Sequence, residues 1–149
     1  MLALRKPYLL FLGDITLPSD AKTGAGLRDW CRDDVMGEWA LPACTVSLGL
    51  PRLSPSDAVR AGAQSLVIGV ASVGGRIPDA WIPALVAAAS TGLDVVSGMH
   101  TRLSSIPPLV RSASSARCKR SRASPTSAAA PDPWPSASST SASGSGERK

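Results

Sequence analysis

Apolar runs and polar, glycine-containing segments alternate along this chain in a way that predicts an α/β fold. The run Leu66–Val70 has the length and β-branched content of a strand buried on both faces. After a Gly-Gly turn, apolar residues recur from Trp81 to Ala89 at the spacing of one helical stripe. Gly92 stands where a helix commonly ends, and Leu93–Ser97 predicts the next strand. The pattern indicates a strand–helix–strand crossover, which is nearly always right-handed.

The N-terminus imitates a secretory signal, because Arg5 and Lys6 precede the apolar run Pro7–Leu12. That run is only 6 residues long before Gly13, and no small-residue cleavage site follows it. We therefore interpret Tyr8–Leu12 as the first buried strand. No segment approaches the ~20 apolar residues that span a bilayer, so no membrane partner is expected.

The middle of the chain predicts two further strands and a helix. Val35–Leu41 and Thr45–Leu48 are short runs that fit strands. Ser54 is a good N-cap, Pro55 fits the first helical position, and Asp57 stands near the positive end of the helix dipole. Together these elements predict a Rossmann-like, open and mostly parallel sheet flanked by helices.

The C-terminal quarter departs from this pattern. A helix is predicted after His100, with Pro107 and Pro108 in its first turn. Residues 112–149 contain no Leu, Ile, Val, Met, Phe or Tyr, so they cannot bury enough surface to offset the entropy lost on ordering. We therefore predict one Rossmann-like domain at 1–111 and a disordered Ser/Ala/Pro/Arg-rich tail beyond it.

Composition and charge narrow the classes of partner. A chain of 149 residues suffices for one domain with a modest core. Residues 1–111 carry 10 Lys/Arg and 9 Asp/Glu, whereas 112–149 carry 6 and 2, so the basic excess lies in the tail. Because the body has no basic stripe or reading motif, no nucleic-acid partner is expected. Cys31, Cys44 and Cys118 lack CxxC spacing and fit reduced thiols in a cytoplasmic protein.

Candidate ligand-binding residues follow the predicted strand ends. Asp14 follows the first strand, and open α/β sheets bind ligands at the carboxyl ends of their strands. Lys22 and Thr23 fit either contacts to an anion at a helix N-terminus or a capped, solvated helix start. Asp14 and Asp79 fit an acid or base role or ordinary solvated carboxylates. Neither GxGxxG nor GxxxxGK[ST] occurs.

His100 is the only histidine and follows a predicted strand end, beside Arg102. Any nucleophile activated by a histidine must use it. A histidine that caps backbone groups also fits this position. One histidine and scattered cysteines supply no cluster of metal ligands, so no metal site is predicted.

Several stretches share the pattern of a known family and cover most of residues 1–110. They are Tyr8–Asp14, Asp20–Thr23 with Gly26, Ser65–Ala71, Gly74 and Gly75 with Ile77 and Trp81, Gly92–Val95, and Gly98–Leu103. In them the chain resembles the Rossmann-like N-terminal domain of the D-glutamate N-acetyltransferase family, formerly a domain of unknown function. The resemblance implies that a P-loop NTPase-like second domain follows in intact relatives.

The resemblance also implies an activity and a set of contacts. Intact relatives would move an acetyl group from acetyl-CoA to the amine of D-glutamate. The cofactor would be acetyl-CoA or a nucleotide, and intact relatives could form homo-oligomers. His100 and Arg102 become candidate contacts to a carboxylate or phosphate, for which Arg is suited. The small-molecule or nucleotide contacts are assigned to Asp14, Lys22, Thr23, Gly74, Gly75, His100 and Arg102.

The chain departs from the family after residue 111, where Ser/Ala/Pro/Arg sequence replaces the expected strand and no P-loop follows. Such composition is typical of a shifted reading frame in GC-rich DNA, so we expect a truncated or frameshifted product. An authentic disordered tail is the alternative. We expect the chain to be inactive alone. The alternative function is a non-catalytic nucleotide-binding or interaction module of the NAD-dependent epimerase/dehydratase-like Rossmann type.

Overall fold

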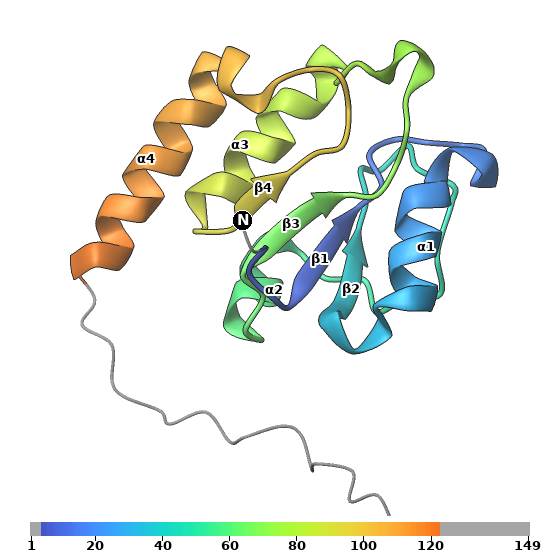
Figure 1. Cartoon of the computed structure of the whole chain (residues 1–149), viewed down its shortest axis with the longest axis horizontal. Helices are drawn as coiled ribbons and strands as arrows, with labels where there is room; N and C mark the ends of the chain where they lie inside the picture. The colour runs from blue at the N-terminus through green and yellow to red at the C-terminus, as the bar shows by residue number, and fades with distance from the viewer. Residues whose placement is uncertain (1–3, 123–149) are drawn as a thin grey trace, which may run out of the picture.

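Four short parallel strands form the centre of the molecule (Figure 1). The computed structural model describes residues 4–122. The strand order is β2-β1-β3-β4, and every neighbouring pair is parallel. The strands are β1 Tyr8–Phe11, β2 Val35–Trp39, β3 Ser65–Ile68 and β4 Asp94–Val96.

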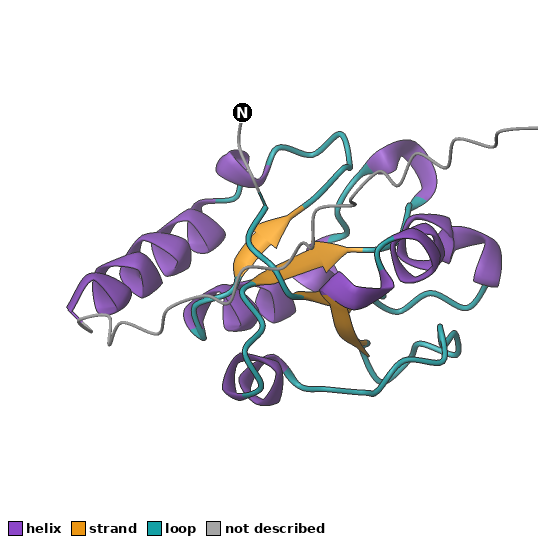
Figure 2. Ribbon diagram, turned by 60° about the horizontal axis from the view of Figure 1, so that its bottom comes forward, coloured by secondary structure: helices purple, strands orange, loops and turns teal. Residues whose placement is uncertain are grey.

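Helices connect the strands and cover both faces of the sheet. They are α1 (Lys22–Trp30) between β1 and β2, α2 (Pro55–Arg60) between β2 and β3, α3 (Ile82–Ser90) between β3 and β4, and α4 (Pro107–Arg122) after β4. The β1-to-β2 connection runs toward one edge and the β3-to-β4 connection toward the other, so right-handed crossovers place α1 and α3 on opposite faces. The long helix in Figure 2, α4, packs mainly against α3.

The predicted strand–helix–strand unit is confirmed, and with it the Rossmann-like fold class. β3, α3 and β4 form the unit, and β3 pairs with β4 in parallel. A short 3-10 turn, η4 (Asp79–Trp81), leads into α3. Gly92 directly follows the C-cap Thr91 and has φ 102°, a conformation that glycine adopts without a Cβ penalty.

The apolar run that imitates a signal peptide is the buried central strand β1, as predicted. All four of its residues are buried, and so are those of β3. The Phe11 ring centroid lies 5.0 Å from that of Trp39 and 5.5 Å from that of Trp81. Each large apolar side chain contributes ~1.5–3 kcal/mol by its burial, so the four buried residues of β1 contribute strongly to the hydrophobic core.

The strand predicted at Thr45–Leu48 is wrong. That segment forms no ladder with the sheet, and Arg52 forms an isolated bridge to β2 at Glu38 further along. Val46 and Leu48 are nevertheless buried. The apolar pattern here reflects a loop packed on the edge of the sheet, because its backbone bonds to a side-chain carboxylate instead of a neighbouring strand.

The helix predicted after His100 extends further than expected. Pro107 and Pro108 occupy the first turn of α4 as predicted, but the helix continues to Arg122. The end of α4 thus overlaps the first residues of the predicted tail, because Ala, Arg and Ser can continue a helix once it has begun. Residues 123–149 lie outside the described residues, so disorder there stays a prediction.

Candidate functional site

The carboxyl ends of all four strands lie at the same end of the sheet, where the connecting loops gather (Figure 1). We call this end the carboxyl edge of the sheet. The switch point lies between the neighbouring strands β1 and β3, since the chain continues from β1 to the outer strand β2 and from β3 to the opposite outer strand β4. Ligands of open α/β sheets bind outside the strand ends at such a switch point. The loops that follow β1 and β3 therefore flank the expected site.

Asp14 lies at this edge and is tied to the loop after β3. Its Oδ1 accepts a hydrogen bond of 2.7 Å from the indole Nε1–H of Trp81. Trp81 is buried, whereas Asp14 is exposed. Gly13 permits this contact, because it has φ 60° and a Cβ there would lie 2.3 Å from Cζ2 of Trp81. The end of β1 is thus joined to the segment before α3.

His100 is held against the same loop from the other side. Its backbone N–H donates to the carbonyl of Gly75 at 2.7 Å, and a Cβ on Gly75 would lie 3.0 Å from the imidazole Nδ1. Gly74 and Gly75 have φ 75° and 64°, and glycine allows this conformation and approach. The backbone N–H of Ile77 donates to Oγ1 of Thr101 at 3.0 Å. The end of β4 is therefore fixed to the loop after β3.

Lys22 and Thr23 are the exposed first residues of α1. The helix begins close to the end of β3, because the Gly24 N–H donates to the Gly69 carbonyl at 2.6 Å. The N-cap residue, Ala21, makes no side-chain hydrogen bond. The start of α1 thus exposes both residues and carries no side-chain cap.

Arg102 and Gly74 complete the predicted set at the surface of this edge. Arg102 is exposed, and within the described residues its guanidinium makes no hydrogen bond or ion pair. Nothing lies within 4 Å of a Cβ built on Gly74. The contacts therefore join Asp14 and His100 to one loop. Within the described residues, the side chains of Lys22, Thr23 and Arg102 make no hydrogen bond or ion pair.

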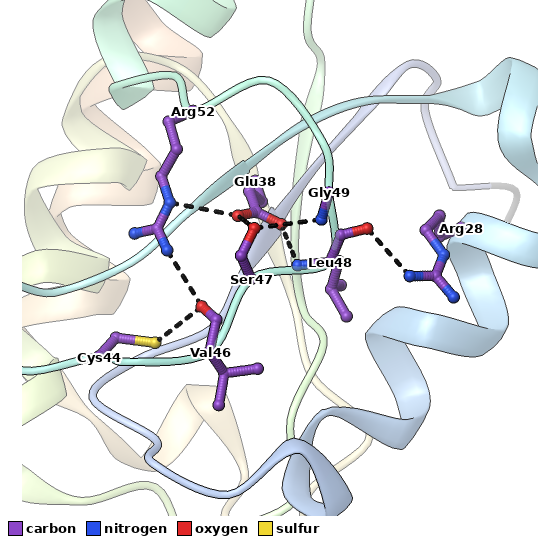
Figure 3. A network of polar contacts seen from close by, with 8 residues as sticks. All are labelled: Arg28, Glu38, Cys44, Val46, Ser47, Leu48, Gly49 and Arg52. Carbon is purple, nitrogen blue, oxygen red and sulfur yellow. Dashed lines mark hydrogen bonds and ion pairs between the residues drawn. The ribbon is translucent and has the colours of Figure 1, made fainter.

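A second polar cluster, which the sequence did not predict, lies at the outer strand of the sheet (Figure 3). Glu38 on β2 is 0% exposed. Its carboxylate accepts hydrogen bonds from Ser47 Oγ and from the Leu48 N–H, both at 2.7 Å, and pairs with Arg52 at 3.2 Å. Both oxygens of the buried carboxylate are thus occupied by the loop that covers β2.

The rest of this cluster fixes the loop further. Arg52 donates to the Val46 carbonyl at 3.0 Å, and the Cys44 thiol donates to the same oxygen at 3.4 Å. Arg28 on α1 donates to the Leu48 carbonyl at 2.9 Å. We therefore assign Glu38 a structural role. Its signal in the sequence is a lone acidic residue inside an apolar run, since a buried charge needs partners.

Two further properties hold for the part of the chain that the structure describes. No helix there is both long and apolar enough to cross a membrane. Among the same residues, His, Cys, Asp and Glu side chains do not gather in groups of three that would suit a metal ion. Cys31 and Cys44 are free thiols and half-buried.

Comparison with known proteins agrees with the fold and extends it. The family described as "Domain of unknown function (DUF1611_N) Rossmann-like domain" matches residues 34–120. The chain belongs to this family. A "D-glutamate N-acetyltransferase" from Tritonibacter scottomollicae is 44% identical over 106 residues, and one from a Pseudoalteromonas species is 37% identical over 107. These matches cover 71% and 72% of this chain but 32% of each relative, so the chain spans about a third of their length.

A solved structure supports the same assignment. The crystal structure of a DUF1611 family protein from Anabaena variabilis ATCC 29413 aligns with a TM-score of 0.60 at 29% identity, covering 74% of this chain and 34% of that chain. The resemblance of the N-terminal part to this family is therefore confirmed. The ligand-binding roles of the seven residues that the sequence singled out stay predictions.

Proposed function

We propose that this chain is the Rossmann-like substrate-binding part of a D-glutamate N-acetyltransferase, with its site at the carboxyl edge of the sheet. Two relatives of that name match the domain at 44% and 37% identity, which supports the substrate class. The observation that carries the proposal is that one loop, between β3 and α3, contacts both Asp14 and His100. That loop also lies at the switch point of the sheet.

The charges of the predicted set complement an amino-dicarboxylate. D-glutamate carries two carboxylates and one ammonium group at neutral pH. Lys22, His100 and Arg102 are exposed donors that suit carboxylates, and Arg102 can bind one in a bidentate manner. Asp14 is the acidic member of the set and suits the ammonium group. The proposed site thus offers one negatively charged acceptor for the ammonium group and several donors for the two carboxylates.

In the proposed reaction, the amine nitrogen of D-glutamate attacks the thioester carbonyl carbon of acetyl-CoA. The ammonium group first loses one proton to solvent, which leaves the neutral amine that attacks. The new C–N bond then forms, the C–S bond breaks, and a second proton passes from the nitrogen to the sulfur of CoA. Each relative is about three times as long as the region it shares with this chain. We propose that the acetyl-CoA contacts come from outside the shared region, so that this chain binds D-glutamate without turning it over.

A non-catalytic nucleotide-binding module is the second candidate. It is favoured by Gly74 and Gly75, which have positive φ values in succession and leave open space beside Gly74. Backbone of this kind lets a phosphate approach its N–H groups closely. The two candidates use the same edge of the sheet, and they differ in the ligand that it binds.

Calorimetric titration of the full chain separates these candidates. We expect D-glutamate to bind and ADP and NAD not to bind, with no N-acetyl-D-glutamate formed when acetyl-CoA is added. His100→Ala and Arg102→Ala should weaken D-glutamate binding. Arg111→Ala, which removes an exposed arginine from α4, is the matched control and should not. Nucleotide binding without D-glutamate binding would favour the second candidate, and binding of neither would contradict both.

A further inference from the structure

We propose that Trp81 is a positioning residue that orients the Asp14 carboxylate, so that one oxygen is held by the protein and the other receives a cationic ligand group. The class of ligand group is a primary ammonium. This inference rests on the proposed function, because it assigns the amine of the amino-acid substrate to Asp14. It adds a residue that the sequence did not single out for the site and gives that residue a specific role.

The indole ring is held rigidly enough to orient a partner. Trp81 is 1% exposed, and its ring meets Phe11 edge-on, at an interplanar angle of 89°. The ring also lies close to Gly13, where a Cβ would come within 2.3 Å of it. A tryptophan N–H is a donor only, so this buried group requires an acceptor. Asp14 Oδ1 fills that requirement at 2.7 Å.

The hydrogen bond fixes one carboxylate oxygen and leaves the other available. Within the described residues, Oδ2 of Asp14 has no hydrogen bond or ion pair. The residue is exposed and lies at the end of the central strand β1, next to the switch point. Asp14 therefore presents an oriented, negatively charged acceptor to a ligand bound at this edge, because its rotation is restricted by Trp81.

A purely structural role for the Trp81 hydrogen bond would not require a charged acceptor. An acceptor without charge, such as an Asn oxygen, would satisfy a buried N–H as well. A carboxylate at this position keeps a full negative charge at the open edge, which an ammonium group can neutralise. The geometry thus combines a buried neutral donor that sets the orientation with an exposed charge that contacts the ligand.

The test uses the full chain labelled with ¹⁵N at the indole nitrogens of its 4 tryptophans. Trp81→Phe identifies the Trp81 signal by its loss. In the absence of ligand, Asp14→Asn should move the Trp81 indole N–H signal strongly, because the acceptor loses its charge. Asp79→Asn is the matched control, since Asp79 is exposed and close in sequence to Trp81 but does not accept its hydrogen bond. It should leave that signal almost unchanged.

Binding of D-glutamate and of glutarate then tests the role of the free oxygen. Glutarate has the same two carboxylates and no amine. Asp14→Asn should weaken D-glutamate binding about tenfold or more, as expected for loss of a charge-assisted hydrogen bond, and should not weaken glutarate binding. Trp81→Phe, which keeps a large aromatic ring and removes the donor, should weaken D-glutamate binding less and also spare glutarate.

The outcomes separate this inference from the proposed function. If D-glutamate binds and Asp14→Asn weakens both ligands equally or neither, the assignment of the amine to Asp14 is overturned while the proposed function stands. If D-glutamate does not bind at all, the proposed function and the amine contact are both overturned. An unchanged Trp81 signal in ligand-free Asp14→Asn would overturn the positioning role by itself.

Discussion

Two carboxylates, Glu38 and Asp14, show how differently this small domain uses the same chemical group. Glu38 is completely buried, and both of its oxygens are occupied by the loop over β2. Asp14 is exposed, and one indole N–H holds one of its oxygens. A saturated buried acid can hold the fold together but has no capacity for a ligand. An oriented acid at an open strand end has that capacity.

The largest expected effect is on stability, at the buried carboxylate. Glu38→Ala removes a buried carboxylate and leaves Ser47 and the Leu48 N–H without an acceptor. We expect the free energy of unfolding to fall by about 2–4 kcal/mol, because the buried Leu48 N–H loses its acceptor and a buried side chain is removed. Urea unfolding followed by circular dichroism measures it.

Arg52→Ala is the control for this prediction, because it removes a half-exposed partner and keeps the two short hydrogen bonds to Glu38. Its effect should be much smaller. Equal losses for the two variants would show that the ion pair, rather than the saturation of a buried carboxylate, stabilises the loop over β2.

The next effect concerns the support of Asp14. Gly13→Ala places a Cβ 2.3 Å from the Trp81 ring at a residue with φ 60°, so both sterics and backbone strain oppose it. We expect a loss of about 1–3 kcal/mol in the free energy of unfolding. Gly26→Ala is the matched control, because Gly26 lies inside α1 and its Cβ would meet nothing within 4 Å. That variant should be as stable as the parent or more stable.

A smaller effect on stability is expected at Asp14 itself. Asp14→Ala leaves the buried indole N–H of Trp81 without its acceptor but removes no buried side chain, so the free energy of unfolding should fall by about 1–2 kcal/mol. The contrast with Glu38→Ala is the essential result, and both variants are compared in the same urea series. A loss at Asp14 as large as that at Glu38 would mean that the carboxyl edge is a structural cluster too.

The smallest effect is a pH dependence at the start of α2. The Ser54 hydroxyl, and after it Arg60, lowers the pKa of Asp57 from its ordinary value of 3.8. Because the folded pKa lies below the unfolded one, the contribution of Asp57 is present above about pH 4 and is lost as pH falls through the folded pKa. Asp57→Asn should therefore reduce stability slightly at pH 7 and not at strongly acidic pH. A difference that persists at low pH would contradict this explanation.

Local patterns in the sequence were enough for most of the fold. Buried parallel strands are continuous apolar runs, and β1 and β3 could be recognised by that property alone. Thr45–Leu48 alternates polar and apolar residues as a strand can, but it packs as a loop, because the Leu48 N–H bonds to a side chain of β2 that no local pattern reveals. The start of α4 at Pro107 and Pro108 could be predicted, whereas its extent to Arg122 depends on Ala, Arg and Lys residues that continue a helix once it has started.

The candidate site was predictable in part for a similar reason. The rule that ligands bind at strand carboxyl ends pointed to Asp14 and His100 without knowledge of the strand order. The bond between Trp81 and Asp14 joins residues 67 positions apart, and the sequence placed Trp81 in a helical stripe and in a family-matching stretch without linking it to Asp14. The Glu38 cluster depends in the same way on the path of a loop. Contacts of this type require the three-dimensional arrangement.

One measurement tests the central distinction between the two clusters most directly. Backbone amide signals of the ¹⁵N-labelled full chain are recorded while D-glutamate is added. We predict that the signals that move belong to the loops at Gly13–Ile15, Ser72–Ile77 and Gly98–Arg102, and that the signals of Cys44–Arg52 stay in place. Movement centred on Cys44–Arg52, with the carboxyl-edge loops unchanged, would contradict the assignment of Asp14 to the ligand and of Glu38 to the fold.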